Sequence, residues 1–350
     1  MANVDTSHTP DIQVDTDQAI LIASIKKFPL PATLDLHACI FDRIYAAGCY
    51  ANLSYFLSHL HPDNIESIQH EGTRQLVNTY KDIAVDVYDD SKHPKAGAIV
   101  IPLDKEIIIA FHGMNFTRKS DHITNLESTL THYPYAPGLY HAGFLSISNA
   151  MTPKIIHILE MKLGSLHTYP HKIKIYGHSM GAGLAQLLTQ YLQHQYENLD
   201  IETIVFGSPK VMCPLAALSY NKKNNNRTMR IENPLDLAIY MPAQFMGYGV
   251  VNNVILLPKT HSDVMRNHGI EGYLESIDTL RQQFRTQGIP SVSMSDYMAA
   301  SARFNPVHPW MSSNNSNSIS TKSSVSEFMQ LMGHGISKGI QSLIRFLPFK

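Results

Sequence analysis

The stretch Gly177-His178-Ser179-Met180-Gly181 decides the fold of this chain because of the segments on either side of it. An apolar run with β character, residues 172–176, leads into the motif, and a helical run, residues 182–195, follows it. A serine on a sharp turn between a strand and a helix has an exposed hydroxyl, and the two glycines let the strand and the helix approach closely. The same five residues also occur as a glycine turn with an uninvolved serine, so a chemical role for Ser179 depends on partner residues elsewhere.

The composition is that of a globular protein with a large core: 350 residues, of which 44% are hydrophobic and 16% are charged. A formal net charge of -1 provides no basic field for a polyphosphate, and the chain has no arginine stripe, zinc-finger spacing or aromatic RNA-binding signature. We therefore predict no nucleic-acid partner. The 19 histidines include no HExxH motif, so we also predict no bound metal.

The N-terminal residues predict no Sec signal peptide. Residues 1–18 carry aspartates and polar residues where such a signal needs a basic start and an apolar core. The most apolar helical stretch, residues 38–60, contains Asp42, Arg43 and Asn52, which favours a helix packed on the domain over one that spans lipid. These patterns predict a cytoplasmic or peripheral membrane protein, and they leave open export by a signal-independent route.

Strands and helices alternate through the middle of the chain. Residues 83–101 are typical of a β-hairpin, and buried strands follow at residues 106–111, 172–176 and 202–206, each ending at a glycine or a loop. Strands rich in Ile and Val that alternate with helices indicate a parallel sheet covered on both faces, with ligand sites at the carboxyl ends of the strands. Residues 17–70 show helical spacing and should form part of the cover.

A serine hydroxyl is a poor nucleophile at neutral pH, so Ser179 needs a histidine base and an acid that orients the base. In sheets of this type these residues follow one another along the chain in the order Ser, Asp, His. Asp236 lies in the loop after a predicted strand, residues 229–232, and is the candidate acid. His268, expected in a loop before a helix, is the candidate base, with His261 as its rival.

Donors for an oxyanion should come from two places in the chain. The backbone N–H of Met180 lies at the predicted start of the helix after Ser179, where the helix dipole favours negative charge. The second donor should come from the loop after residues 106–111, around Met114 and Asn115.

A series of short motifs occurs in a fixed order over roughly residues 82–284. The motifs are Phe111-His112-Gly113, Asp121-His122-Ile123-Thr124-Asn125-Leu126, His141-Ala142-Gly143-Phe144, Gly177-His178-Ser179-Met180-Gly181-Ala182-Gly183-Leu184-Ala185, Phe206-Gly207-Ser208-Pro209-Lys210-Val211, Asn233-Pro234-Leu235-Asp236, and His268 with Tyr273. In this order they resemble the class 3 lipases, a family of triacylglycerol lipases and phospholipase A1-type enzymes with the α/β-hydrolase fold. The resemblance implies Ser179 as nucleophile, Asp236 as orienting acid and His268 as base. It further implies cleavage of lipid carboxylic esters through an acyl-enzyme, without a cofactor.

The chain departs from the family pattern in two places. The usual Arg-Gly-Thr or Arg-Gly-Ser oxyanion motif reads His112-Gly113-Met114, so the supporting hydroxyl is missing, although the N–H of Met114 remains and Asn115 can add a side-chain donor. The usual Asp-Trp pair reads Asp121-His122. Two alternatives to a lipase or phospholipase therefore stay open: a soluble esterase or thioesterase with the same triad, and a catalytically weak binding module with a hydrolase fold.

The resemblance and the composition divide the chain into four expected segments. They are an N-terminal helical cover at residues 1–81, a catalytic α/β-hydrolase core at residues 82–288, an irregular segment with a polar linker at residues 289–324, and an amphipathic C-terminal helix at residues 325–350. The last segment carries an apolar stripe made of Phe328, Leu331, Met332, Ile336, Ile340, Leu343, Ile344 and Leu347. Such a helix would contact a membrane peripherally or pack back on the core.

Overall fold

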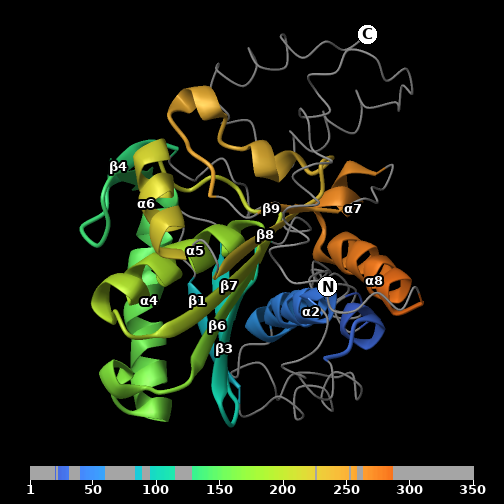
Figure 1. Cartoon of the computed structure of the whole chain (residues 1–350), viewed down its shortest axis with the longest axis horizontal. Helices are drawn as coiled ribbons and strands as arrows, with labels where there is room; N and C mark the ends of the chain where they lie inside the picture. The colour runs from blue at the N-terminus through green and yellow to red at the C-terminus, as the bar shows by residue number, and fades with distance from the viewer. Residues whose placement is uncertain are drawn as a thin grey trace, which may run out of the picture.

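The computed structural model describes residues 20, 23–30, 40–59, 83–88, 95–114, 128–224, 227–251, 254–257 and 263–286 (Figure 1). Asn115, His261, the predicted polar linker and the predicted C-terminal helix lie outside these residues.

Seven strands form the central sheet, in the order β1-β2-β3-β6-β7-β8-β9. They are β1 (Ala84–Tyr88), β2 (Ala96–Pro102), β3 (Glu106–Phe111), β6 (Lys172–His178), β7 (Asp200–Phe206), β8 (Thr228–Glu232) and β9 (Val254–Leu256). The pairs β1–β2 and β2–β3 are antiparallel, and every later pair in the order is parallel. The prediction of a mostly parallel α/β sheet is therefore confirmed.

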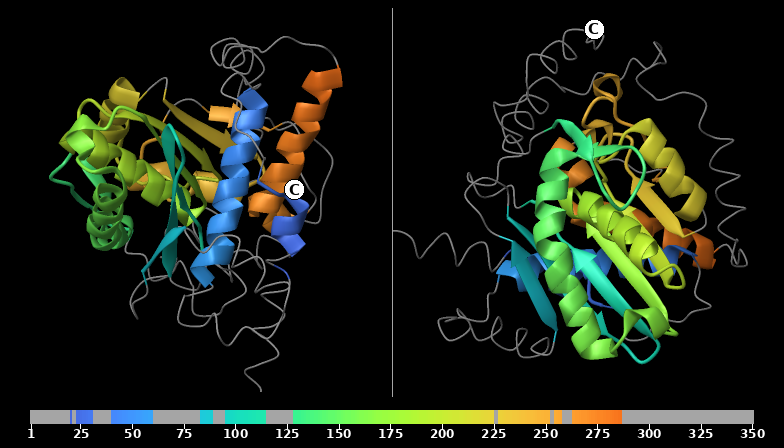
Figure 2. Two further views of the ribbon diagram at one scale, coloured as in Figure 1. Left: turned by 90° about the horizontal axis from the view of Figure 1, so that it is seen from below. Right: turned by 90° about the vertical axis from the view of Figure 1, so that its left-hand side faces the viewer.

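Helices cover both faces of this sheet, as Figure 2 shows from two sides. One face carries α4 (Ala142–Leu163) and α5 (Met180–Gln195), and the other carries α2 (Ile40–His59) and α8 (Ile270–Thr286). The remaining elements are β4 (Leu130–His132), β5 (Leu139–His141), η3 (Leu166–Thr168), α6 (Pro214–Asn224), η4 (Leu237–Tyr240), η5 (Gln244–Met246) and α7 (Val264–His268). None of the helices within the described segments has both the length and the apolar character needed to cross a membrane.

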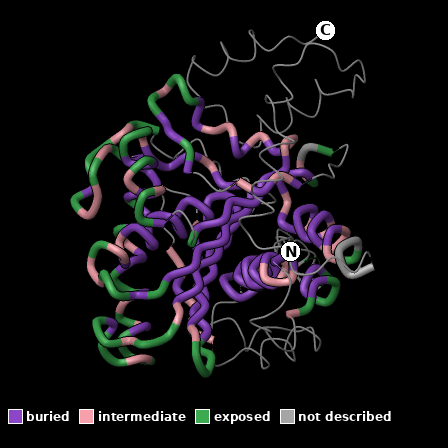
Figure 3. The backbone as a smooth tube through the Cα atoms, viewed as in Figure 1, coloured by how far each residue is buried: buried purple, intermediate pink, exposed green. Residues whose placement is uncertain are grey.

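Alternating side chains of the strands explain why the sheet has a core on each face. In β3, Ile107 and Ile109 belong to the apolar cluster that includes α4 and α5, whereas Ile108 and Ala110 belong to the cluster that includes α2 and α8. A strand covered on both faces needs apolar residues at every position, which accounts for its nearly continuous Ile and Val sequence. Figure 3 shows these strands buried along most of their length.

Strand β6 continues beyond its predicted end at residue 176. Gly177 and His178 still pair with Val205 and Phe206 of β7, so the turn begins only at Ser179. Ser179 has φ 56, in the left-handed region that favours glycine. Backbone strain of this kind is found at functional sites, where the surrounding structure enforces it.

Two glycines allow β6 and α5 to meet at this turn. A Cβ on Gly177 would lie 2.3 Å from the carbonyl oxygen of Gly181, and a Cβ on Gly181 would lie 2.5 Å from the carbonyl oxygen of His112. Backbone therefore touches backbone at both positions, and no side chain fits at either.

We expect Gly177→Ala to destabilise the protein by about 4 kcal/mol or more, because the added Cβ meets backbone atoms that cannot move independently. Gly164→Ala is the matched control, since its Cβ meets nothing within 4 Å and it adds only the strain of φ 77, about 1–3 kcal/mol. Thermal unfolding of the two variants measures the difference, and equal losses would contradict the close approach at the turn.

Candidate active site

The structure brings together Ser179, Asp236 and His268, which come from three separate elements. Ser179 lies between β6 and α5. Asp236 follows β8 and caps η4, with its Oδ1 accepting a hydrogen bond from the backbone N–H of Ala238 at 2.8 Å. The sequence predicts a loop position for His268, and this detail is wrong, because His268 is the last residue of the short helix α7. The carboxylate of Asp263 caps the N-terminus of this helix.

Two hydrogen bonds join the three side chains. His268 Nε2 lies 2.8 Å from Ser179 Oγ, and His268 Nδ1 lies 2.9 Å from Asp236 Oδ1. An ionised aspartate only accepts hydrogen bonds, so Nδ1 carries the proton and donates it to Asp236. Nε2 then holds a lone pair and accepts the hydroxyl proton of Ser179. In this tautomer His268 can act as a general base toward Ser179.

The second carboxylate oxygen of Asp236 is held by Tyr273, which lies on α8. The Tyr273 hydroxyl donates to Asp236 Oδ2 at 2.7 Å and accepts a hydrogen bond from the backbone N–H of Asn233 at 3.1 Å. Burial, together with the charge of Asp236, raises the pKa of Tyr273 well above its usual value, so the hydroxyl stays a donor. Gly207, with φ 54, leaves room for this contact, since a Cβ there would lie 2.6 Å from Asp236 Oδ2.

A pair of asparagines ties the loop of Asp236 to the helix of His268. Asn233 Nδ2 donates to Asn267 Oδ1 at 2.8 Å, and both side chains are buried. The sequence does not predict this contact, and it places Tyr273 in a motif without indicating what its side chain does. The available signal was weak: the hydroxyl of a buried tyrosine needs a partner, but the sequence does not say which one.

The two backbone segments expected to hold an oxyanion both lie beside Ser179. Met180 is the first residue of α5, and its N–H is among those that find no partner within a helix. Gly113 touches the other side of the serine, since a Cβ on it would lie 2.6 Å from Ser179 Cβ. Met114 follows Gly113 and is buried, while Asn115 lies outside the described residues.

The turn predicts an exposed hydroxyl for Ser179, and this expectation is wrong, because all three side chains are closed to solvent. The exposed fraction is 2% for Ser179, 1% for His268 and 0% for Asp236. A buried site has a low local dielectric, which strengthens the hydrogen bonds within it.

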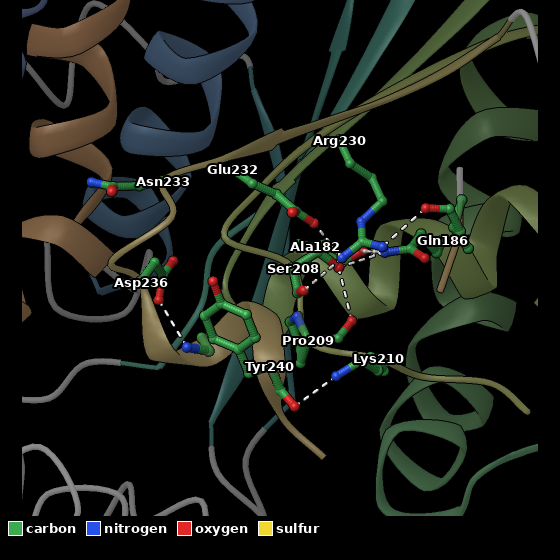
Figure 4. A network of polar contacts seen from close by, with 12 residues as sticks. Ala182, Gln186, Ser208, Pro209, Lys210, Arg230, Glu232, Asn233, Asp236 and Tyr240 are labelled. Atoms are coloured by element: carbon green, nitrogen blue, oxygen red, sulfur yellow. Dashed lines mark hydrogen bonds and ion pairs between the residues drawn. The ribbon is translucent and has the colours of Figure 1, made fainter. Parts of the chain in front are cut away.

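Buried charged side chains bind the backbone of the segment that follows β8 (Figure 4). Arg230, on β8, forms an ion pair of 2.6 Å with Glu232 and donates to the carbonyl oxygens of Ser208 at 3.2 Å and Val251 at 3.0 Å. These contacts join the loop after β7 to the far end of the segment that begins with Asp236.

Lys210 holds the middle of the same segment. Its Nζ donates to the carbonyl oxygens of Tyr240 at 2.6 Å and Pro242 at 3.1 Å. Burial, with a smaller contribution from Arg230, lowers the pKa of Lys210 to about 8. The loop carrying Asp236 is thus fixed at several points along its length, which keeps the carboxylate in position.

Fold and site together define a class of protein. A largely parallel sheet, a serine on a strained turn between a strand and a helix, and a histidine and an aspartate at the ends of later elements are the features of the α/β-hydrolases. Within the part of the chain that the structure describes, no group of three or more His, Cys, Asp or Glu side chains is arranged to hold a metal ion.

Comparison with known proteins supports a similarity to one family within that class. Residues 108–246 match the family model described as Lipase (class 3). This matched region, less than half of the chain, and the α/β-hydrolase fold together make the chain similar to the class 3 lipases. The resemblance stated from the sequence motifs is confirmed.

Individual relatives are distant. The chain is 25% identical over 160 residues to Phospholipase A(1) DAD1, chloroplastic, of Arabidopsis thaliana. This alignment covers 39% of the present chain and 34% of the relative, so the chain spans about a third of the relative's length. The crystal structure of M37 lipase superposes with a TM-score of 0.51 at 17% identity, covering 73% of this chain and 98% of that one, and supports the fold. A lipase from Rhizopus microsporus var. chinensis is 20% identical with a TM-score of 0.49, over 77% of this chain and 90% of that one.

We expect Tyr273→Phe to destabilise the protein by about 2 kcal/mol, because the substitution removes a partner from two buried groups, Asp236 Oδ2 and the N–H of Asn233. Tyr240→Phe is the matched control: it removes a partly buried hydroxyl that donates to one carbonyl, that of Pro234 at 2.9 Å, and should cost less than about 1 kcal/mol. Denaturant unfolding of both variants checks the difference, and a smaller loss for Tyr273→Phe than for the control would overturn this role of the hydroxyl.

Proposed function

We propose that the chain is a serine hydrolase that cleaves carboxylic esters of lipids, of the triacylglycerol lipase or phospholipase A1 type. The observation that carries the proposal is the 2.8 Å hydrogen bond between Ser179 Oγ and His268 Nε2, with Asp236 on the opposite nitrogen. A serine in this arrangement gains a base for its proton and an acid that stabilises the resulting imidazolium.

In the proposed reaction, Ser179 Oγ attacks the ester carbonyl carbon as its proton passes to His268 Nε2. The negative charge that develops on the carbonyl oxygen is stabilised by the N–H groups of Met180 and Met114, and Asp236 stabilises the positive charge on His268. His268 then protonates the leaving alcohol as the carbon–oxygen bond breaks, which leaves an acyl group on Ser179. A water molecule, deprotonated by His268, attacks this acyl-enzyme and releases the fatty acid.

A lipid ester is the proposed substrate for two reasons. The family comprises lipases, and the Arabidopsis relative is named as a phospholipase A(1). In addition, the segment that follows Asp236 presents apolar side chains to solvent, with Phe245 64% exposed and Val250 39% exposed. An acyl chain bound along this segment would remove these apolar side chains from water.

Peripheral membrane contact through residues 325–350 is a further part of the proposal and is supported by the sequence pattern alone. An amphipathic helix gains free energy at an interface by burying its apolar stripe, and Lys338, Arg345 and Lys350 would add attraction to anionic lipid.

We expect Ser179→Ala to abolish hydrolysis of short-chain and long-chain acyl esters while leaving the melting temperature close to that of the wild type. Loss of the nucleophile of such a triad lowers kcat by several orders of magnitude. The measurements are ester hydrolysis, labelling by a fluorophosphonate, and lipid mass spectrometry after incubation with mixed membranes. A folded variant that keeps more than about a tenth of the activity would refute the assignment of Ser179.

The same measurements on the wild type separate the alternative functions. A wild type that is neither labelled nor hydrolyses esters would favour the binding module. A wild type that hydrolyses only soluble esters would favour the esterase or thioesterase.

We expect His268→Ala and Asp236→Asn to lower kcat by about 10³-fold or more, because each removes a group that acts on the Ser179 proton or orients the base. His261→Ala, the rival histidine, serves as the control and should change kcat by less than about threefold. Steady-state kinetics on the three variants decide between the histidines. If His261 proves indispensable, His268 is not the base.

We expect truncation from residue 312 onward to weaken binding to liposomes and hydrolysis of lipid packed in them, with little effect on a soluble short-chain ester. The reason is that the apolar stripe of residues 325–350 acts at an interface and adds nothing to the triad. Liposome sedimentation and parallel assays on the two substrates measure this. Loss of soluble-ester activity together with thermal stability would show instead that the tail is part of the folded core.

A further inference from the structure

A tyrosine from the N-terminal helix reaches the residue beside the nucleophile. Tyr55 lies on α2, outside residues 108–246 that match the family, and its hydroxyl oxygen is 2.7 Å from Nδ1 of His178. His178 directly precedes Ser179 and is 2% exposed. Its other ring nitrogen, Nε2, lies 2.6 Å from the backbone carbonyl oxygen of His268. The imidazole of His178 therefore links Tyr55 on α2 to the backbone of His268, the proposed base.

The direction of each hydrogen bond follows from the chemistry of the partners. A carbonyl oxygen only accepts, so Nε2 of His178 carries a proton and donates to His268. Burial, with the nearby His268 as a second cause, lowers the pKa of His178 to about 3, so the ring is neutral at neutral pH and Nδ1 holds a lone pair. Tyr55 must then donate its hydroxyl proton to Nδ1. Burial raises the pKa of Tyr55, so the hydroxyl keeps that proton.

The Tyr55 hydroxyl also lies close to Gly113, in the loop after β3. Gly113 is the residue before Met114, and a Cβ on it would lie 2.6 Å from the Tyr55 hydroxyl and 2.6 Å from Ser179 Cβ. Hydrogen bonds thus run from Tyr55 through His178 to the carbonyl of His268, and the Tyr55 hydroxyl packs against the loop after β3.

Ring packing supports this chain of hydrogen bonds. The centroid of the Tyr55 ring lies 5.2 Å from that of His112 and 5.9 Å from that of His178, and the rings of His178 and His268 are 5.1 Å apart. The buried ring of His178 therefore has contacts on both sides as well as hydrogen bonds at both nitrogens, and it has little freedom to rotate.

We propose that Tyr55 and His178 are a positioning pair, which sets the loop of Met114 and the backbone of His268 in place around Ser179. The inference rests on the proposed hydrolysis by Ser179. The 2.7 Å and 2.6 Å hydrogen bonds of the pair join the two residues to each other and to a backbone carbonyl, and not to Ser179 Oγ or the His268 ring. Oxyanion stabilisation depends on where the donor N–H lies, and a base must stay within hydrogen-bond reach of the nucleophile, so small displacements at either end lower the rate.

The closing experiment compares Tyr55→Phe in the full chain with Tyr45→Phe and the wild type, on a soluble short-chain ester. Tyr45 is the matched control, since it lies on the same helix ten residues earlier, about 15 Å along the axis, where its ring packs on Arg281 at 4.0 Å. We expect Tyr55→Phe to lower kcat about tenfold with KM within about twofold, because a donor is displaced rather than removed. Tyr45→Phe should leave kcat unchanged.

Active-site titration with a fluorophosphonate separates positioning from folding. If the pair positions the site, the final labelled fraction of Tyr55→Phe equals that of the wild type, while the labelling is slower and kcat per titrated site is lower. A reduced labelled fraction that accounts for the whole loss of rate, or an equal loss in Tyr45→Phe, would overturn the proposal. A wild-type rate for Tyr55→Phe would overturn it while leaving the hydrolase function intact. If the wild type itself shows no hydrolysis that depends on Ser179, both proposals fail.

A second pair of variants tests the bond from His178 to His268. His178→Gln keeps an N–H near the position of Nε2, whereas His178→Leu has no donor. We expect kcat of the glutamine variant to exceed that of the leucine variant by about fivefold at similar melting temperatures, since only glutamine can bond the His268 carbonyl. Equal kcat values would show that the hydrogen bond from His178 to the His268 carbonyl does not affect the rate.

Discussion

The contact between strand β6 and helix α5 at Gly177 and Gly181 is the constraint on which the rest of the site depends. Because backbone meets backbone there, the helix starts immediately beyond the strand and its first N–H groups lie beside Ser179. Gly181 also touches the carbonyl oxygens of Phe111 and His112, so the end of β3 lies against the same turn. The nucleophile candidate and both segments that carry oxyanion donors are therefore set by one close approach.

Parallel pairing then supplies the partners of Ser179. Strands β6, β7 and β8 are neighbours in the sheet, so their carboxyl ends share one edge, and the loop after β8 carries Asp236 to it. His268 arrives from α7, after the last strand of the sheet. The buried contacts of Tyr273 and the asparagine pair fix these two elements relative to each other, which matters because the loop and α7 share no strand pairing.

The sequence sufficed for features that depend on local pattern. Strand and helix periodicity predicted the parallel sheet and its two covered faces, and the strand–turn–helix context of Gly177-His178-Ser179-Met180-Gly181 singled out Ser179. It was less informative where tertiary pairing decides the outcome: β6 runs two residues further than predicted because β7 continues beside it, and His268 ends a helix rather than lying in a loop.

Contacts between distant residues could not be found from one sequence. The partners Asn233 and Asn267 are 34 residues apart, Asn233 and Tyr273 are 40 apart, and Tyr55 and His178 are 123 apart. None of these pairs follows a spacing rule, since each depends on how two elements are packed across the sheet. The sequence predicts the candidate catalytic residues better than the residues that hold them, because the former lie in short motifs and the latter share only a tertiary contact.

The backbone of Ser179 also has an evolutionary consequence. With φ 56, the serine pays a conformational penalty of about 1–3 kcal/mol that a glycine at the same position would avoid. In the proposed hydrolase, selection for a reactive hydroxyl and selection for a stable fold thus act in opposite directions at position 179. In a duplicated copy released from selection for chemistry, glycine at position 179 would accumulate as a stabilising change, so an inactive paralogue of this chain should be recognisable by a third glycine in its turn and by a higher melting temperature.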